Sequence, residues 1–176
     1  MQKNLPELQY ELLFDFSSIE QACRWRPVND VIMGGRSSGT ICVSNENVAV
    51  FEGFITPKQG IGFSSVKAPI NNFSFLGYDG VCLKMRTDGK RYKFRLIYAD
   101  DYQGFAYQHG LEIQKGEWRE VHLAFSNFKP CFRGQQPANA KLLNIAQVRQ
   151  VGLLISDRRA GAFKMECDWI KAYQEK

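Results

Sequence analysis

The sequence predicts an all-β protein, a β-sandwich or jelly roll with one or two short helical turns. Three observations support this class. Apolar and polar residues alternate with a period of two through most of the chain, turn-forming residues separate these runs, and helical patterns are scarce. Many short strands punctuated by turns are typical of sandwiches and jelly rolls.

The alternating runs define the expected strands. They cover residues 12–16, 40–43, 48–54, 61–68, 81–87, 91–98, 105–114, 118–125, 151–156 and 162–173. Ser17, followed by Glu20 at the capping-box offset, predicts one helical turn from Ile19 to about Arg24, which ends before Pro27. Residues 144–147 are expected to form a second turn.

The chain of 176 residues fits one domain, expected over residues 10–173 behind a flexible N-terminus, residues 1–9. A chain of this length buries about 70% of its unfolded surface, so its core needs no disulfide or metal. The five cysteines are odd in number, widely spaced and without a C-x-x-C motif. We therefore expect reduced thiols, no metal site and no cofactor.

The ends and the charge of the chain bear on its location and partners. The sequence contains no signal peptide, no transit-peptide bias and no apolar run long enough to span a bilayer. A cytoplasmic protein is expected, held at a membrane only through a partner. The net charge of +5 permits attraction to an anionic surface but does not establish nucleic-acid binding.

Asp88-Gly89 between two alternating runs predicts a two-residue hairpin in which Thr87 faces Lys90 and Cys82 faces Arg95. The polar face of this hairpin would carry a ladder of like charges, which oppose each other unless something compensates. Nearby acidic residues would compensate, or the ladder would bind an anionic partner such as RNA. This possible anionic-partner face comprises Lys84, Arg86, Arg91, Lys93 and Arg95.

The segment from Arg24 to Gly39 departs from the period of two and contains two adjacent glycines. Gly34 and Gly35 permit a positive φ and close backbone approach, while Asn29 and Asp30 can bind local amides or a cation. One interpretation is a loop that closes one end of the sandwich, anchored by Trp25 and Met33. The other is a surface that contacts a partner, and the two are compatible.

The sequence does not assemble the known catalytic or nucleotide-binding sets. It has no G-x-G-x-x-G, no Walker motif, no G-x-S-x-G elbow and no H-E-x-x-H. His109 and His122 lie in separate strand patterns, so a zinc site is not expected. We expect no enzyme and no catalytic residue. Tyr102, Phe105 and Tyr107 are the candidates for stacking on a sugar ring.

A family resemblance covers about residues 10–173. Its most specific part is Trp25 followed by the run from Val28 to Ser37, VNDVIMGGRS, which resembles the hallmark of the complex I intermediate-associated protein 30 (CIA30) family. Weaker matches follow in order: Phe51-Glu52-Gly53, Gly62-Phe63-Ser64-Ser65, Asp79-Gly80, the run from Arg86 to Tyr92, Trp118, Val121, Phe125, Phe128, Pro130, Arg133-Gly134, Gly161, Phe163 and Asp168-Trp169-Ile170.

The resemblance implies a galactose-binding-like jelly roll and a non-catalytic, chaperone-like assembly factor for a respiratory or photosynthetic membrane complex. The expected partner is a protein client of that complex. The alternatives are a carbohydrate-binding module and an RNA-binding accessory protein that uses the basic hairpin. The residues expected to bind the ligand or client are Trp25, Asn29, Asp30, Met33, Gly34, Gly35, Arg36, Ser37, Arg133 and Gly134.

Overall fold

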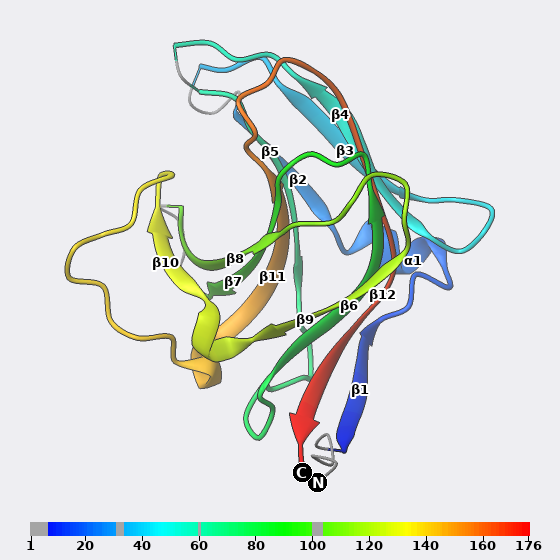
Figure 1. The fold of residues 1–176 in the computed structure, drawn as a ribbon, viewed down its shortest axis with the longest axis vertical. Coiled ribbons are helices and arrows are strands. Elements are labelled where there is room, and N and C mark those ends of the chain that lie inside the picture. The colour runs from blue at the N-terminus through cyan, green and yellow to red at the C-terminus, as the bar shows by residue number, and fades with distance from the viewer. Residues whose placement is uncertain (1–6, 31–33, 60, 100–103) are drawn as a thin grey trace, which may run out of the picture.

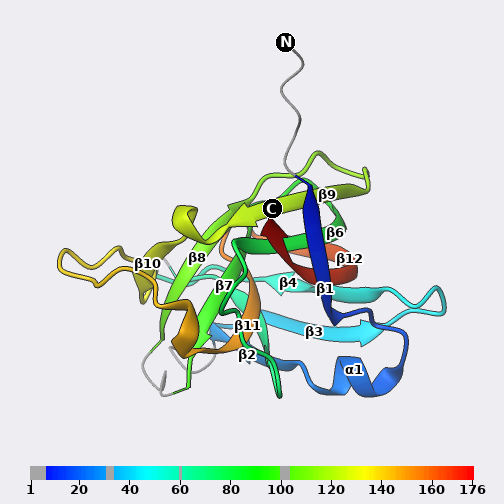
Figure 2. The same ribbon diagram turned by 90° about the horizontal axis from the view of Figure 1, so that it is seen from below.

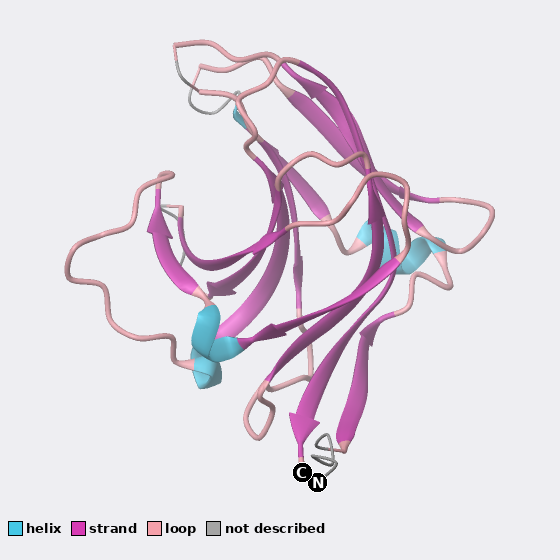
Figure 3. Ribbon diagram, viewed as in Figure 1, coloured by secondary structure: helices cyan, strands magenta, loops and turns pink. Residues whose placement is uncertain are grey.

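The computed structural model describes residues 7–30, 34–59, 61–99 and 104–176. In this part of the chain two antiparallel sheets pack face to face and helix is confined to short turns (Figures 1 and 3). The all-β sandwich is therefore confirmed. None of the described helices is long and apolar enough to cross a membrane.

Sheet A has the strand order β3-β4-β12-β6-β9, and β1 pairs with the C-terminal half of β12. Its longest strand, β12, pairs with β4 through its first half and with β6 along most of its length. The bounds are β1 (Leu8–Phe14), β3 (Ser38–Val43), β4 (Ala49–Ile55), β6 (Gly80–Thr87), β9 (Arg119–Ala124) and β12 (Gly161–Glu175).

Sheet B has the order β10-β8-β7-β11-β5-β2. Figure 1 shows its strands as an arc whose open side faces away from sheet A. The bounds are β2 (Arg26–Asn29), β5 (Ser64–Pro69), β7 (Tyr92–Tyr98), β8 (Phe105–Leu111), β10 (Lys129–Phe132) and β11 (Val148–Ile155).

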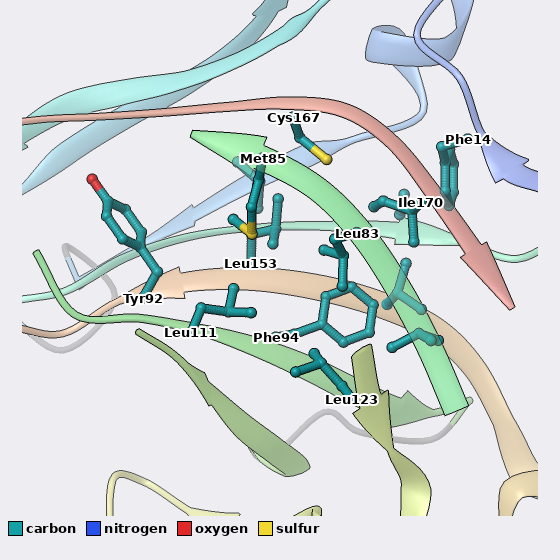
Figure 4. Packing of buried hydrophobic residues seen from close by; sticks show 14 of the residues in the cluster. Phe14, Leu83, Met85, Tyr92, Phe94, Leu111, Leu123, Leu153, Cys167 and Ile170 are labelled. Carbon is teal, nitrogen blue, oxygen red and sulfur yellow. The ribbon is translucent and has the colours of Figure 1, made fainter. Parts of the chain in front are cut away.

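The core lies between the sheets and collects the inward residues of both. Leu83 and Met85 of β6 meet Phe94 of β7, Leu111 of β8 and Leu153 of β11, and all five side chains are fully buried (Figure 4). The alternation seen in the sequence thus produces one continuous core, as expected when two sheets each bury one face.

The predicted Asp88-Gly89 hairpin is wrong. β6 pairs with β12 and β9 in sheet A, whereas β7 pairs with β8 and β11 in sheet B, so the turn crosses between sheets. Asp88 fixes this crossing, because its carboxylate accepts hydrogen bonds from Lys90 N, the Tyr92 hydroxyl and Lys164 N. Turn chemistry predicted the bend correctly but not the partner of each strand.

The sequence missed two strands, β2 and β10, which are the edges of sheet B. Each has four residues and contains a proline, Pro27 or Pro130. Proline lowers the strand signal, yet an edge strand tolerates it because one side of its backbone needs no ladder partner.

The helical turns match the expectation in place. α1 (Ile19–Cys23) lies beside β3 (Figure 2), and a 3₁₀ turn, η3 (Ile145–Gln147), is capped by Asn144. The predicted Ser17 cap is wrong, since Ser18 holds the cap position without a side-chain bond. Another 3₁₀ turn, η2 (Phe125–Asn127), was not predicted.

The N-terminal boundary also differs from the expectation. Of the predicted flexible segment, residues 1–6 lie outside the described part of the chain. Leu8 and Gln9 already belong to β1, where they pair with Glu175 and Gln174 of β12.

Candidate partner-binding site

The segment between β2 and β3 is organised around the buried carboxylate of Asp30. One oxygen, Oδ1, accepts a hydrogen bond from Ser37 N at 2.9 Å, and Oδ2 accepts one from Phe63 N at 3.1 Å. The Asp30 backbone carbonyl also accepts from Gly35 N at 2.9 Å. Asp30 is 0% exposed, so its carboxylate serves the fold and is not available to a partner.

Asn29 and Ser37 extend this anchoring to both sheets. The Asn29 side-chain oxygen Oδ1 accepts a hydrogen bond from the Ser64 hydroxyl at 2.6 Å, and its side-chain Nδ2 donates to Gly39 O in β3. The buried Ser37 hydroxyl accepts from Thr56 N at 3.0 Å. The interpretation of this loop as a plug at one end of the sandwich is therefore consistent with its contacts.

Close packing explains why the segment needs glycine. A Cβ on Gly35 would lie less than 3.0 Å from the Asp30 carboxylate, and one on Gly39 would lie less than 3.0 Å from the Ser64 hydroxyl. Both neighbouring side chains are held by the hydrogen bonds given above, so displacing either one would break those bonds.

The same loop presents only part of its sequence to solvent. Gly34, with φ +81°, and Arg36 are exposed, and Arg36 forms no ion pair within the described residues. Trp25 is 3% exposed and packs against Phe14 and Phe16, so it belongs to the core. Met33 lies outside the described residues.

Arg133 and Gly134 form the two-residue turn that follows β10. Both have a positive φ, 48° and 81°, and Phe132 and Gln135 exchange backbone hydrogen bonds across them, as in a type I′ turn. Both residues are exposed. Because β10 and β2 are opposite edges of sheet B, the structure does not join this turn to the Arg36 loop in one site.

The five cations expected on one hairpin face are divided between the sheets. Lys84 and Arg86 lie in β6 and are paired with carboxylates of β12, with Lys84 Nζ 2.9 Å from Asp168 and Arg86 Nε 2.7 Å from Glu166. The hydrogen bond from Arg86 holds the pKa of Glu166 below its usual value. Acidic neighbours thus compensate these two cations, as one interpretation expected.

The other three cations lie at or in β7. Arg91 precedes the strand, and its backbone N–H donates to Asp157. Lys93 and Arg95 alternate with the buried Tyr92 and Phe94, so they lie on the outer face of sheet B. A ladder of all five cations does not form.

Sequence reasoning missed an aromatic surface on the outer face of sheet A. Trp118 is 36% exposed, and the Arg86 guanidinium lies 5.0 Å from its ring centroid. Lys171 Nζ lies 3.9 Å from the centroid of Trp169 and 5.9 Å from that of Tyr10. The alternating pattern could have placed Lys171 on the outer face. It could not have placed Trp169 there, because β12 has a register shift between Cys167 and Trp169, which changes the face on which the Trp169 side chain lies.

The residues considered for chemistry or sugar stacking have other roles. His122 Nε2 lies 2.8 Å from the Tyr10 hydroxyl. Tyr107 is buried and its hydroxyl donates to Lys141 O, Phe105 is partly buried against the core, and Tyr102 is outside the described residues. In the described ranges, His, Cys, Asp and Glu side chains form no group of three or more that could hold a metal ion.

Comparison with known proteins gives a family match and relatives in two nematodes. A family model described as "Complex I intermediate-associated protein 30 (CIA30)" matches residues 14–167. Proteins of Caenorhabditis elegans and Caenorhabditis briggsae, each named "Probable complex I intermediate-associated protein 30, mitochondrial", are 27% identical in an alignment 160 residues long that covers 80% of this chain and 47% of each relative. The chain spans about half the length of these curated relatives.

Solved structures share the fold. A family 11 carbohydrate-binding module from Clostridium thermocellum superposes with a TM-score of 0.67 at 14% identity, covering 96% of this chain and 95% of the module. An agarase, AgWH50C, gives a TM-score of 0.61 at 13% identity, covering 95% of this chain and 24% of the enzyme. At such identities the likeness shows the jelly-roll fold and does not transfer a ligand.

Proposed function

The chain belongs to the CIA30 family, and from this membership we propose that it is a non-catalytic assembly factor that binds a protein client of a respiratory or photosynthetic membrane complex. Two facts support the proposal. The nematode relatives are named for association with intermediates of complex I. In the segment most typical of the family, the described residues Asp30 and Ser37 are joined by a hydrogen bond, and Asp30 also binds Phe63 N.

The observation that carries the proposal is the exposure of Arg36 on a backbone fixed by Asp30. Arg36 is exposed, while its neighbours Gly35 and Ser37 are buried. A preorganised loop loses little conformational entropy on binding, and arginine is enriched among the residues that dominate protein interfaces. Arg36 is therefore the residue that we expect to contact the client.

The roles of the nearby ionisable groups favour binding over catalysis. The Asp30 carboxylate accepts backbone N–H groups, and the Asp88 carboxylate holds the crossing between the sheets. A group committed to such contacts is poorly placed to act as a general base, which must reach a substrate proton.

The test is affinity purification from the native host with identification of the captured proteins by mass spectrometry. Wild-type protein should retain subunits or intermediates of a membrane complex. Arg36→Glu should fold normally and lose them, whereas Lys141→Glu, an equal charge change at an exposed loop residue, should retain them. Capture of no such subunit by the wild type would refute the assembly role, and full retention by Arg36→Glu would refute the contact at the loop.

A further inference from the structure

The excess of positive over negative charge in this protein lies in sheet B. The six strands of sheet B contain no aspartate or glutamate, but they carry six lysines and arginines. The six strands of sheet A carry six carboxylates and five lysines and arginines. Outside these strands the remaining 12 lysines and arginines equal the remaining 12 aspartates and glutamates, so the net charge of +5 arises in sheet B.

The register of sheet B aligns four of its cations in one row across all six strands. The paired residues, in order from β10 to β2, are Lys129, Gln108, Arg95, Gly152, Lys67 and Arg26. Their strand neighbours Phe94, Val66 and Tyr107 point into the core, so the row lies on the outer face. We call these six residues the basic row.

Three of the four cations in the basic row, Arg26, Lys67 and Lys129, have no carboxylate partner within the described residues. Lys67 and Arg26 are directly opposite each other, and like charges in that position are unfavourable. By contrast, Lys84 and Arg86 of sheet A are both paired with carboxylates. The carboxylates that neutralise those two cations of sheet A thus have no counterpart at these three residues of sheet B.

The shape of the row suits an extended ligand. Neighbouring strands are about 4.8 Å apart, so a row across six strands spans about 24 Å, the length of roughly seven residues of extended peptide. Gly152 leaves the middle of the row without a side chain. The Gln108 side chain lies half-buried between Lys129 and Arg95 in the row and carries no charge that would compensate them.

We propose that the basic row is the docking track for an extended acidic segment of the client. This inference rests on the proposed function only in naming the client as the source of the segment. An acidic peptide supplies a carboxylate for each cation at a spacing that an extended chain can match. The outward positions of the six strands carry no aromatic ring, and such rings are the usual platforms for nucleobases in single-stranded nucleic-acid sites.

The test measures fluorescence anisotropy of a labelled decaglutamate peptide with the full chain. Wild-type protein should bind it, with affinity falling as salt is raised, and should not bind decaglutamine. Reversing two cations in Lys67→Glu/Lys129→Glu should weaken binding about tenfold or more. The matched control, Lys115→Glu/Lys141→Glu, changes the net charge equally at exposed loop residues and should weaken it less than about twofold.

Three results would overturn the proposal: equal loss in the control pair, equal binding of decaglutamine, or tighter binding of decauridylate than of decaglutamate, which would identify the occupant as nucleic acid. Thermal unfolding of each variant shows whether it is folded, and the single variant Lys129→Gln, at an exposed edge position, should show a smaller loss in the same direction. The peptide measurement contains no client, so its failure is distinguishable from a failure to capture a membrane complex.

Discussion

The carboxylate of Asp30 occupies the space that a side chain at Gly35 would need. A Cβ on Gly35 would approach Asp30 Cγ and both carboxylate oxygens to less than 3.0 Å. The Asp30 side chain cannot retreat without giving up Ser37 N and Phe63 N. These two residues of the family segment therefore depend on each other.

Replacing Gly35 should destabilise the protein through this overlap. We expect Gly35→Ala to lower the free energy of unfolding by about 1–3 kcal/mol, the usual cost of overpacking. The measurement is urea unfolding followed by tryptophan fluorescence. Gly110→Ala is the control, because a Cβ there meets nothing within 4 Å, and it should be neutral or slightly stabilising. A neutral Gly35→Ala would show that Asp30 can move.

Removing the Asp30 carboxylate should destabilise the protein for a different reason. Asp30→Ala leaves the N–H groups of Ser37 and Phe63 without their acceptor in a buried corner, which costs about 1–3 kcal/mol for each group. The same change removes the atoms that Gly35→Ala would strike. In a double-mutant cycle, Gly35→Ala should therefore cost less in the Asp30→Ala background than in the wild type. Additive losses would contradict the overlap.

The strands of the core could be predicted from sequence because burial of one face imposes a period of two. Leu83 and Met85 alternate with Lys84 and Arg86 whichever strand lies beside them. The partner of a strand is decided by contacts distant in sequence. Asp88 shows this, because its carboxylate binds Lys164 N of β12, which is 76 residues away.

The candidate site was predicted in part. The glycine pair and Asp30 marked the loop, but the sequence did not show that Asp30 and Trp25 would be buried while Arg36 remained exposed. The basic row was beyond the reach of sequence patterns, since Lys129 and Arg26 lie in the two strands whose prolines hid them. Its alignment exists only through the register of six strands.

Acid should destabilise the fold through carboxyl groups whose pKa is lowered in the native state. The hydrogen bond from Arg159 lowers the pKa of Asp157, and that from Arg86 lowers the pKa of Glu166. A group with a lowered native pKa stabilises the fold above its unfolded pKa, and this contribution is lost as the pH falls through the native value. The loss should begin near pH 4.5 for Glu166 and near 3.8 for Asp157, their ordinary values.

The measurement is the urea midpoint between pH 6 and about 2.5, where the paired carboxylates become protonated. Glu166→Gln should be less stable than the wild type near neutral pH and should lose less stability on acidification. Glu112→Gln is the control, because Glu112 is exposed and forms no ion pair within the described residues. A Glu166→Gln curve parallel to that of the wild type would argue against the Arg86 contact.

The five free thiols should separate into two classes of reactivity. Cys23 and Cys42 are exposed, whereas Cys82, Cys131 and Cys167 are buried. Burial raises the pKa of the Cys82 thiol to about 12 and also raises that of Cys167, which removes the reactive thiolate at neutral pH.

Titration of the native protein with an aromatic disulfide reagent should therefore release a fast signal equivalent to two thiols, and the remaining three should react only in denaturant. Cys42 lies on edge strand β3, where its outward position exposes it. Cys42→Ser should reduce the fast class to one thiol and leave the slow class unchanged. Rapid reaction of a third thiol in the folded protein would mean that one of the sheets opens on the timescale of the reagent, because each buried cysteine lies in a paired strand of one sheet or the other.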